Sequence, residues 1–565
     1  MGLFHAKIRL AKVSEWGAHG ADPLAPFGRQ NCAWAGALSQ VYVAHTARGN
    51  ALKPTTRGDE GFCLERSDME PVGHAHIHAT GGDLTRRYLY LIVGLIALRA
   101  VVAALLPLSF DESYYWLWSK HLASGYYDAP PLIAYAIRAG TAVFGNTPFG
   151  VRACAIAFSI LTSWAIWRAG SELFGHEEDG ARASLLFNLT LMCNVELMTG
   201  TPDAPLIAFS SLFVLAMVRL ETRSEGRWWI AAGIAGGLAL LSKYTALFLA
   251  AGAYVYMVLS PNARRWLRSP LPYAGFLLAV LMFGPDLWWN AQHGWISFAF
   301  QFGKAANDHF APKHILGFVA AQLGLATPLI LALALFGLAR GRGLLWALSL
   351  PTVAFFSFHA LQARVEGNWP CFLYPTLALA AAREWKSAGN AFEQFCKRWA
   401  MWLAALILAV SYVQALFAVL PVPDPTAHLL ASGFPSVAEE LAELRTREGA
   451  DAFAATSYAL TGWLSFYNPS RAPVTQLNQS ERWLAAPLAA PSLLQKPMIY
   501  VAEPRRDRSK MLTKEFHSVR LITRLVRLRA GRVVDRYNVY LLQGFNGKAA
   551  LRVANQSRST AIMAE

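Results

Sequence analysis

Two adjacent carboxylates, Asp111 and Glu112, stand at the end of the first long apolar segment, and aromatic residues follow them at Tyr114, Tyr115 and Trp116. A carboxylate at a membrane boundary can hold an acceptor hydroxyl and remove its proton as a general base. The same residues also suit a polar helix end beside a belt of interfacial aromatic side chains. The pair alone therefore leaves a catalytic and a structural interpretation open.

A proline-containing turn, Gly125 to Leu132, follows the carboxylate pair and carries Asp128, Pro130 and Pro131. Two consecutive prolines stiffen the backbone and remove two N–H donors. Taken alone, the segment is a rigid loop before an interfacial helix. Its combination with the Asp-Glu pair, at this distance, favours a functional interpretation.

The elements that must position these residues are membrane helices. The chain has 565 residues, of which 55% are hydrophobic and 15% are charged, and its mean hydropathy is +0.30. Apolar runs such as 88–108, 206–220, 271–289 and 315–338 are close to the roughly 20 residues that cross a bilayer as a helix. They lack the alternation of polar and apolar residues that membrane barrel strands show.

The formal net charge of +15 does not indicate a nucleic-acid partner, because the basic residues lie mostly in short loops between apolar runs and in the C-terminal tail. If all the basic loops lie on the inside, a consistent topology of about eleven to thirteen spans results. The predicted spans are 88–108, 150–167, 183–199, 205–220, 228–242, 245–259, 271–289, 315–338, 344–358, 370–382 and 399–420. The outer loops are then 109–149, 290–314 and 359–369, and 114–122 and 131–144 are expected to be short interfacial helices.

The sequence predicts three parts. Residues 1–83 are polar and without helix or strand periodicity, so we expect a disordered extension, and an alternative is that translation starts at Met69. Residues 84–420 form the membrane part. Residues 421–565 are expected to form a small soluble α/β domain, with a helix at 435–447 and strands at 498–501, 519–528 and 533–542. That domain has no glycine-rich nucleotide motif, and the six cysteines have no metal-site spacing.

Several further segments share an order and a predicted outer face with the carboxylate pair and the Pro-Pro turn. They are Thr201–Pro205, Leu241–Tyr244, Gly284–Asn290, His293–Trp295, Phe300–Gln301, Gly367–Pro370 and Tyr374. Together these motifs resemble the GT-C membrane glycosyltransferases, the class that includes protein O-mannosyltransferases, aminoarabinose transferases of lipid A and rhizobial galacturonosyltransferases. The resemblance runs from about residue 86 to 420. It implies an α-helical polytopic membrane protein of GT-C type, here with a small C-terminal α/β domain.

The resemblance also implies a chemistry. The donor is a polyprenyl-phosphate sugar, and the acceptor is a cell-envelope molecule: lipid A or core glycan, another glycan, a lipid or a protein. Asp111 is the expected catalytic carboxylate, with Glu112 beside it, and attack opposite the leaving phosphate would invert the anomeric centre. The residues expected to bind donor or acceptor are Tyr114, Asp128, Asp203, Lys243, Asp286, Lys304, Glu366 and Asn368. We expect a multi-pass protein of the bacterial inner membrane, with the active site and the C-terminal domain in the periplasm.

One position departs from the aminoarabinose-transferase branch, in which a lysine that meets the donor phosphate precedes the Pro-Pro pair. Here that residue is Ala129. Other cations must then hold the phosphate, and the outer-face candidates are Lys243, Lys304, His309, Lys313 and Arg364.

A divalent cation is a further candidate ligand, because carboxylates at the ends of two spans can converge. Asp111 and Asp203 are the expected pair. For Asp286, the alternatives are capping a span and orienting Asn290. Glu366 and Asn368 are expected to contact the sugar, although a structural role suits them equally.

Two other function classes compete with an enzyme. A transporter or flippase for lipids or glycans also has many spans and intramembrane polar residues, but it usually places them near the midplane and shows internal repeats. Here the carboxylates gather at one face and no repeat is evident. A non-catalytic assembly protein would use the C-terminal domain as its binding part.

Overall fold

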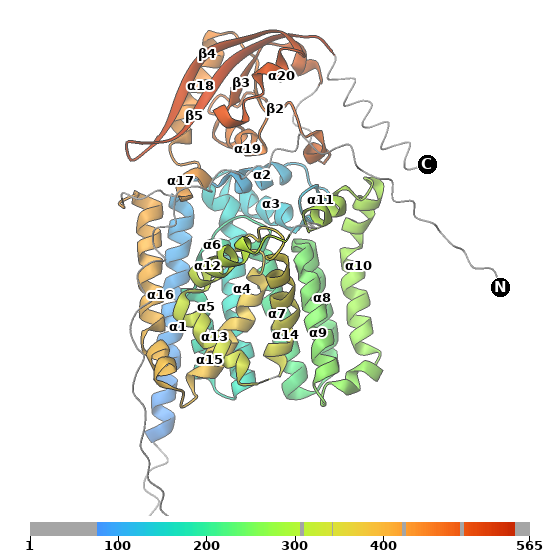
Figure 1. Ribbon diagram of the computed structural model, residues 1–565, viewed down its shortest axis with the longest axis vertical. Helices are drawn as coiled ribbons and strands as arrows, with labels where there is room; N and C mark the ends of the chain where they lie inside the picture. The colour runs from blue at the N-terminus through green and yellow to red at the C-terminus, as the bar shows by residue number, and fades with distance from the viewer. Residues whose placement is uncertain (1–75, 306–309, 342, 421–424, 486–490, 548–565) are drawn as a thin grey trace, which may run out of the picture. The chain divides into compact units, whose positions relative to one another are not determined.

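The computed structural model describes residues 76–305, 310–341, 343–420, 425–485 and 491–547. It consists of a bundle of helices followed by a domain built on a five-stranded sheet. Figure 1 shows the bundle helices running side by side, with the sheet and its helices beyond one end of the bundle. The predicted fold class, a helical membrane protein with a small C-terminal α/β part, is confirmed.

The helices of the bundle follow the predicted spans. In chain order they are α1 (His76–Leu105), α4 (Pro148–Phe174), α5 (Glu177–Leu189), α6 (Leu191–Glu196), α7 (Asp203–Arg223), α8 (Arg227–Ser242), α9 (Leu247–Leu259), α10 (Leu271–Gln292), α12 (Lys313–Ala326), α13 (Pro328–Ala339), α14 (Leu344–His359), α15 (Tyr374–Trp385) and α16 (Ala391–Phe417). Residues 76–83, which the sequence places in the N-terminal extension, form the first turns of α1.

Every predicted span contains a helix, but the helices differ in length. In the described part of the chain, five are long and apolar enough to cross a membrane: α1 over Asp83–Leu105, α4, α7, α10 and α16. The apolar helices α8 and α14 are shorter, as is the stretch Tyr244–Leu259 that contains α9. Of the five long helices, α7 is the most buried, so Asp203 at its start is held by the centre of the bundle.

For two spans, the prediction of one continuous helix is wrong. The span 315–338 is the pair α12 and α13, bent by 101°. The bend arises at Thr327, whose φ of +63° ends α12, and at Pro328, which has no N–H to continue the preceding helix. The span 183–199 is interrupted at Thr190, which is extended and caps α6 with its hydroxyl.

Two short helices lie across the end of the bundle nearest the C-terminal sheet (Figure 1). They are α2 (Phe110–Trp118) and α3 (Leu132–Phe144), near the interfacial helices predicted at 114–122 and 131–144. The chain continues from α10 into α11 (Ile296–Ala305), which also lies at this end (Figure 1).

The C-terminal domain contains α17 (Pro425–Leu429), α18 (Phe434–Arg447), β1 (Ala452–Ala455), α19 (Tyr458–Tyr467), β2 (Val474–Gln476), β3 (Met498–Ala502), α20 (Ser509–Leu512), β4 (Phe516–Arg529) and β5 (Arg532–Phe545). The strand order is β2-β1-β3-β5-β4; β1 runs parallel to β2 and β3, and β5 is antiparallel to β3 and β4. The predicted helix and three predicted strands are present as α18, β3, β4 and β5. The short strands β1 and β2 and the helix α19 were not predicted.

Helix α19 packs directly on α2, and this contact joins the two parts of the chain. It requires a glycine at Gly462, because a Cβ atom there would lie 2.5 Å from the Ser113 hydroxyl and 3.0 Å from the Tyr114 backbone nitrogen. Nearby, the Tyr467 hydroxyl accepts a hydrogen bond from the backbone N–H of Leu108 at 2.7 Å. The segment that leads into the carboxylate pair is thus held by the C-terminal domain.

Candidate active site

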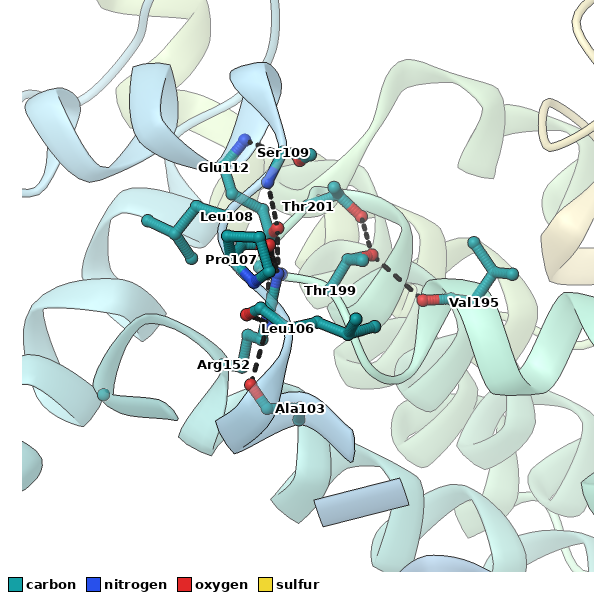
Figure 2. Close-up of polar contacts among 12 residues, drawn as sticks. Ala103, Leu106, Pro107, Leu108, Ser109, Glu112, Arg152, Val195, Thr199 and Thr201 are labelled. Carbon is teal, nitrogen blue, oxygen red and sulfur yellow. Dashed lines mark hydrogen bonds and ion pairs between the residues drawn. The ribbon is translucent and has the colours of Figure 1, made fainter. Parts of the chain in front are cut away.

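Asp111 lies in the first turn of α2, and its neighbours determine where that helix begins. The Ser109 hydroxyl accepts a hydrogen bond from the Glu112 backbone N–H at 3.2 Å, and the Glu112 carboxylate accepts one from the Ser109 backbone N–H at 2.8 Å. This capping box satisfies two N–H groups that the first turn of a helix leaves unpaired. Figure 2 shows Ser109 and Glu112 in contact, and their hydrogen bonds fix the start of the helix that carries Asp111.

Glu112 is fully engaged in a buried ion pair. Arg152 of α4 donates from Nε to Oε1 at 2.6 Å and from Nη2 to Oε2 at 2.7 Å, and neither side chain is exposed. The backbone N–H of Gly200 donates to the same carboxylate at 2.9 Å. Arg152 also donates to the carbonyl groups of Ala103 and Leu106, as Figure 2 shows.

These contacts give Glu112 an environment different from that of a catalytic acid or base. Burial alone would raise the pKa of Glu112, but Arg152 and the backbone N–H groups of Gly200 and Ser109 outweigh burial and lower it below the ordinary value. Both carboxylate oxygens already have donors. The sequence placed Glu112 beside Asp111 as a second catalytic carboxylate, whereas its contacts suit a fixed structural ion pair.

Asp111 has the opposite character. Its side chain is half-buried, and its Oδ1 accepts a hydrogen bond from the hydroxyl of Tyr458 on α19 at 3.2 Å. Burial raises the pKa of Asp111 to about 6; the hydrogen bond from Tyr458 opposes this rise and the charge of Asp128 adds to it. A carboxylate with this pKa is a stronger base than an ordinary aspartate and is still mostly ionised at neutral pH.

Asp128 lies in the Pro-Pro turn and joins the same group of side chains. Nη1 of Arg482 lies 2.6 Å from both of its carboxylate oxygens, and the Tyr114 hydroxyl donates to Oδ2 at 2.7 Å. The guanidinium of Arg482 also lies over the rings of Tyr458 and Tyr127, at 4.6 Å and 5.3 Å from their centroids. The structure thus brings together Tyr114 and Asp128, both predicted binding residues, with a cation from the C-terminal domain.

Asp203 forms a second group of contacts at the start of α7. Its Oδ1 accepts from Lys243 Nζ at 2.7 Å and from the Cys371 thiol at 3.1 Å, and its Oδ2 accepts from the Asn368 amide at 3.0 Å. The three predicted binding residues Asp203, Lys243 and Asn368 are therefore neighbours, although they come from three separate segments.

Glu196, at the end of α6, connects the two groups electrostatically. It is buried, its Oε2 accepts from the Thr201 hydroxyl at 3.3 Å, and it interacts with the charges of Asp203, Lys243 and Asp111. The sequence did not single it out. A glutamate on a mostly apolar segment, Leu191 to Met198, was the available signal.

Asp286 is fully buried in α10. Its Oδ2 accepts hydrogen bonds from the Tyr244 hydroxyl at 3.3 Å and from the Asn290 amide at 3.2 Å. The second contact is the one expected if Asp286 orients Asn290, one of the two roles considered for it from the sequence. Its Oδ1 is buried without a hydrogen-bond partner in the described structure. The backbone of Gly125 passes close by, since a Cβ atom there would lie 3.0 Å from that oxygen.

The remaining predicted residues lie at the margin of the site or outside the residues that the structure describes. Glu366 pairs with its neighbour Arg364 at 3.1 Å, and the Arg364 side chain is more than half exposed. Lys313 is exposed at the start of α12. The side chain of Lys304 and the whole of His309 lie outside the described residues.

A divalent cation does not fit these contacts well. Both oxygens of Asp203 already accept hydrogen bonds, one of them from a cation, and Asp111 is bonded to Tyr458. Within the described residues, no three His, Cys, Asp or Glu side chains are grouped as a metal site. The metal held by Asp111 and Asp203 stays a prediction, and no chemical step below depends on it.

Tyr458 and Arg482 were missed for a physical reason. Both lie more than 300 positions from Asp111 and belong to a domain whose only predicted role was to bind a partner. The packing of α19 on α2 brings Tyr458 to the site, and the contact of Arg482 with Asp128 brings the turn Ser480–Trp483 there. No local sequence pattern marks such a contact.

Comparisons with known proteins indicate which proteins this chain resembles in sequence and in fold. The family described as "Dolichyl-phosphate-mannose-protein mannosyltransferase" matches residues 128–289. The lipid A galacturonosyltransferase RgtD of Rhizobium johnstonii is 29% identical over 306 residues, which cover 51% of this chain and 63% of that protein. The apo structure of ArnT from Cupriavidus metallidurans is similar with a TM-score of 0.56 at 16% identity, covering 82% of this chain and 98% of that one. The structure of ArnT bound to undecaprenyl phosphate gives a TM-score of 0.54 at 16% identity, with 80% and 98% covered.

The chain therefore has the GT-C fold, as its motifs predicted, and its sequence is similar to a membrane glycosyltransferase and to the mannosyltransferase family over residues 128–289. None of these likenesses is to a transporter. The aligned region spans 63% of the length of the curated galacturonosyltransferase.

Proposed function

We propose that this protein transfers a sugar from a polyprenyl-phosphate donor to a hydroxyl group of a cell-envelope acceptor. The observation that carries the proposal is Asp111, a half-buried carboxylate at the outer end of the bundle whose pKa is raised to about 6. A relative that acts on lipid A and a structural neighbour that was solved with undecaprenyl phosphate support this donor and an acceptor of the lipid A kind.

The chemistry uses Asp111 as a general base. The acceptor hydroxyl gives its proton to the Asp111 carboxylate while its oxygen bonds to the anomeric carbon of the sugar. The bond from that carbon to the phosphate oxygen breaks, and the electron pair leaves with the polyprenyl phosphate. Attack opposite the leaving group inverts the anomeric centre. General base catalysis of this type contributes about 10²- to 10⁴-fold in rate.

The location follows from the same proposal. The protein spans the bacterial inner membrane, the basic loops are cytoplasmic, and the site and the C-terminal domain face the periplasm. The envelope acceptor and the lipid-linked donor then meet at the membrane surface. The lipid A or core glycan is the first acceptor to test, followed by other glycans, lipids and proteins.

The test is consumption of radiolabelled polyprenyl-phosphate sugar by the purified full-length protein, with lipid A as acceptor. The wild-type protein should release the polyprenyl phosphate, whereas Asp111→Asn should do so at least 100-fold more slowly. The exposed aspartate Asp451, in the C-terminal domain, gives the matched control Asp451→Asn. If the wild-type protein consumes none of a panel of polyprenyl-phosphate sugars, or if both variants behave alike, the proposal fails.

A further inference from the structure

Arg482 is a cation at the site with an unused hydrogen-bond donor. It lies in a short 3-10 turn, Ser480–Trp483, of the C-terminal domain. Only Nη1 contacts Asp128, and Nε is buried without a hydrogen-bond partner in the described structure. A buried charged donor without an acceptor is unfavourable. Among the described residues, Nε of Arg182, Arg445 and Arg527 is also buried without a partner, so it is the position of Arg482 beside Asp128 and Asp111 that distinguishes it.

The surroundings of Arg482 hold its guanidinium in one place. The rings of Tyr458, Tyr127 and Phe300 lie 4.6 Å, 5.3 Å and 5.6 Å from its central carbon, and Asp128 anchors Nη1. The charge of Arg482 acts on Asp111. Asp111 accepts a hydrogen bond from the hydroxyl of Tyr458, and the guanidinium of Arg482 lies over the ring of the same tyrosine. A fixed guanidinium with a free edge, next to the catalytic carboxylate, is arranged to bind an oxyanion.

The cations that the sequence offered for this task are less suitable. Lys243 lies 2.7 Å from Asp203 in the second group of contacts. Arg364 is paired with its neighbour Glu366 and is mostly exposed, and Lys313 is exposed on α12. Arg482, by contrast, contacts Asp128. Asp128 directly precedes Ala129, the position at which the aminoarabinose-transferase branch has its phosphate-contacting lysine.

We infer that Arg482 binds the phosphate of the lipid-linked donor, and that Asp128 holds the guanidinium in place for it. The inference rests on the proposed function, because it assumes a phosphate leaving group. When the bond to the anomeric carbon breaks, negative charge increases on that phosphate, and a preorganised guanidinium stabilises it. The C-terminal domain then supplies part of the donor site.

The experiment measures binding of undecaprenyl phosphate and of uncharged undecaprenol to the purified full-length protein by a change in tryptophan fluorescence. The wild-type protein should prefer the phosphate. Arg482→Gln should weaken binding of the phosphate by about 10- to 100-fold, the range for loss of a charged hydrogen bond, and leave binding of the alcohol unchanged. Arg520, paired with Glu448 elsewhere in the domain, gives the matched control Arg520→Gln, which should bind both like the wild type.

Asp128→Asn separates this role from a purely structural ion pair. It removes the counter-charge but keeps an oxygen for Arg482, so it should bind undecaprenyl phosphate at least as tightly as the wild type. If Arg482→Gln binds the phosphate normally, or if both variants weaken it equally, the pair only docks the domain and the inference is overturned. If the wild-type protein shows no preference for the phosphate, the donor class of the proposed function fails as well.

Discussion

The hydroxyl of Tyr458 donates a hydrogen bond to Oδ1 of Asp111 at 3.2 Å, across 347 positions of sequence. One residue belongs to the C-terminal domain and the other to the first outer helix of the membrane part. A residue of the C-terminal domain thus orients the carboxylate that is the base of the proposed reaction. If Asp111 is the base, this contact makes its basicity depend on the C-terminal domain.

Replacement of Asp111 by Asn should lower turnover by about 10² or more, because the amide keeps the size of the side chain but cannot take a proton. Binding of the donor should survive, since Asp111 is not the proposed phosphate ligand. Single-turnover kinetics with a labelled donor measure both quantities. Near-normal turnover with a verified donor would exclude Asp111 as the base and make Asp128 the next candidate.

Replacement of Tyr458 by Phe should change the pH dependence of the reaction. In the wild type, kcat/KM should rise with pH through about 6, as Asp111 loses its proton. The Tyr458 hydrogen bond lowers the pKa of Asp111, so its loss should raise that pKa further and move the acid limb of the profile to higher pH.

The matched control for that experiment is Tyr467→Phe on the same helix. Tyr467 accepts from the Leu108 backbone and touches no carboxylate in the described contacts, so its loss should change stability and not the acid limb. An acid limb that stays in place in Tyr458→Phe would show that the hydrogen bond does not tune Asp111.

The sequence predicted the parts of this fold that depend on local pattern. Apolar runs placed a helix at every expected span, and the motifs gave Asp111, Asp128 and Asp203 as candidate site residues. It did not predict the bend at Thr327, because the predicted span was continued across Pro328, a residue whose missing N–H interrupts the hydrogen bonds of a helix.

The contacts that define the site were less predictable, because they join segments far apart in the chain. Glu112 and Asp111 are adjacent and chemically alike, yet Arg152 neutralises only Glu112. Sequence spacing gives no information on which of two neighbouring carboxylates faces a buried cation. The pairing of Lys243 with Asp203, at 40 positions, has the same origin in packing.

Replacement of Asp203 by Asn should lower stability by about 1–3 kcal/mol, because Lys243 loses its counter-charge in a mostly buried place. Adding Lys243→Met should recover part of that loss, since the unpaired charge is then removed. Thermal unfolding in detergent of the wild type, the two single variants and the double variant measures the coupling between the two residues. Simple additivity of the two changes would mean that the pair has no coupling.

The same Asp203→Asn variant tests the metal. Divalent cations are added to chelator-treated protein while donor binding is followed. If divalent cations strengthen donor binding to the wild type but not to Asp203→Asn, the predicted metal shared with Asp111 is supported. The absence of stimulation in the wild type would contradict it and leave Asp203 as the partner of Lys243.

The topology predicts opposite compartments for two positions. Reporter fusions at Arg342, in a basic loop, and at Asp424, after the last span, should be cytoplasmic and periplasmic, respectively. An alkaline phosphatase reporter, active only in the periplasm, distinguishes them. The same compartment for both would contradict the assignment of the site to the periplasmic face.

Replacement of Glu112 by Gln should destabilise the protein by about 3–5 kcal/mol, because it leaves the guanidinium of Arg152 buried without a counter-charge. Since the pKa of Glu112 is held below its ordinary 4.5, the stability from this pair is fully present above about pH 4.5 and is lost only as the pH falls through the lower folded value. The loss of stability in Glu112→Gln should therefore be the same at pH 5.5 and pH 7.5. The activity that depends on Asp111, by contrast, should change between these two pH values. Thermal unfolding at both values measures it, with Asp111→Asn as the neighbouring control that should unfold nearly as the wild type does. A Glu112→Gln protein with normal stability and no turnover would instead make Glu112 a catalytic residue.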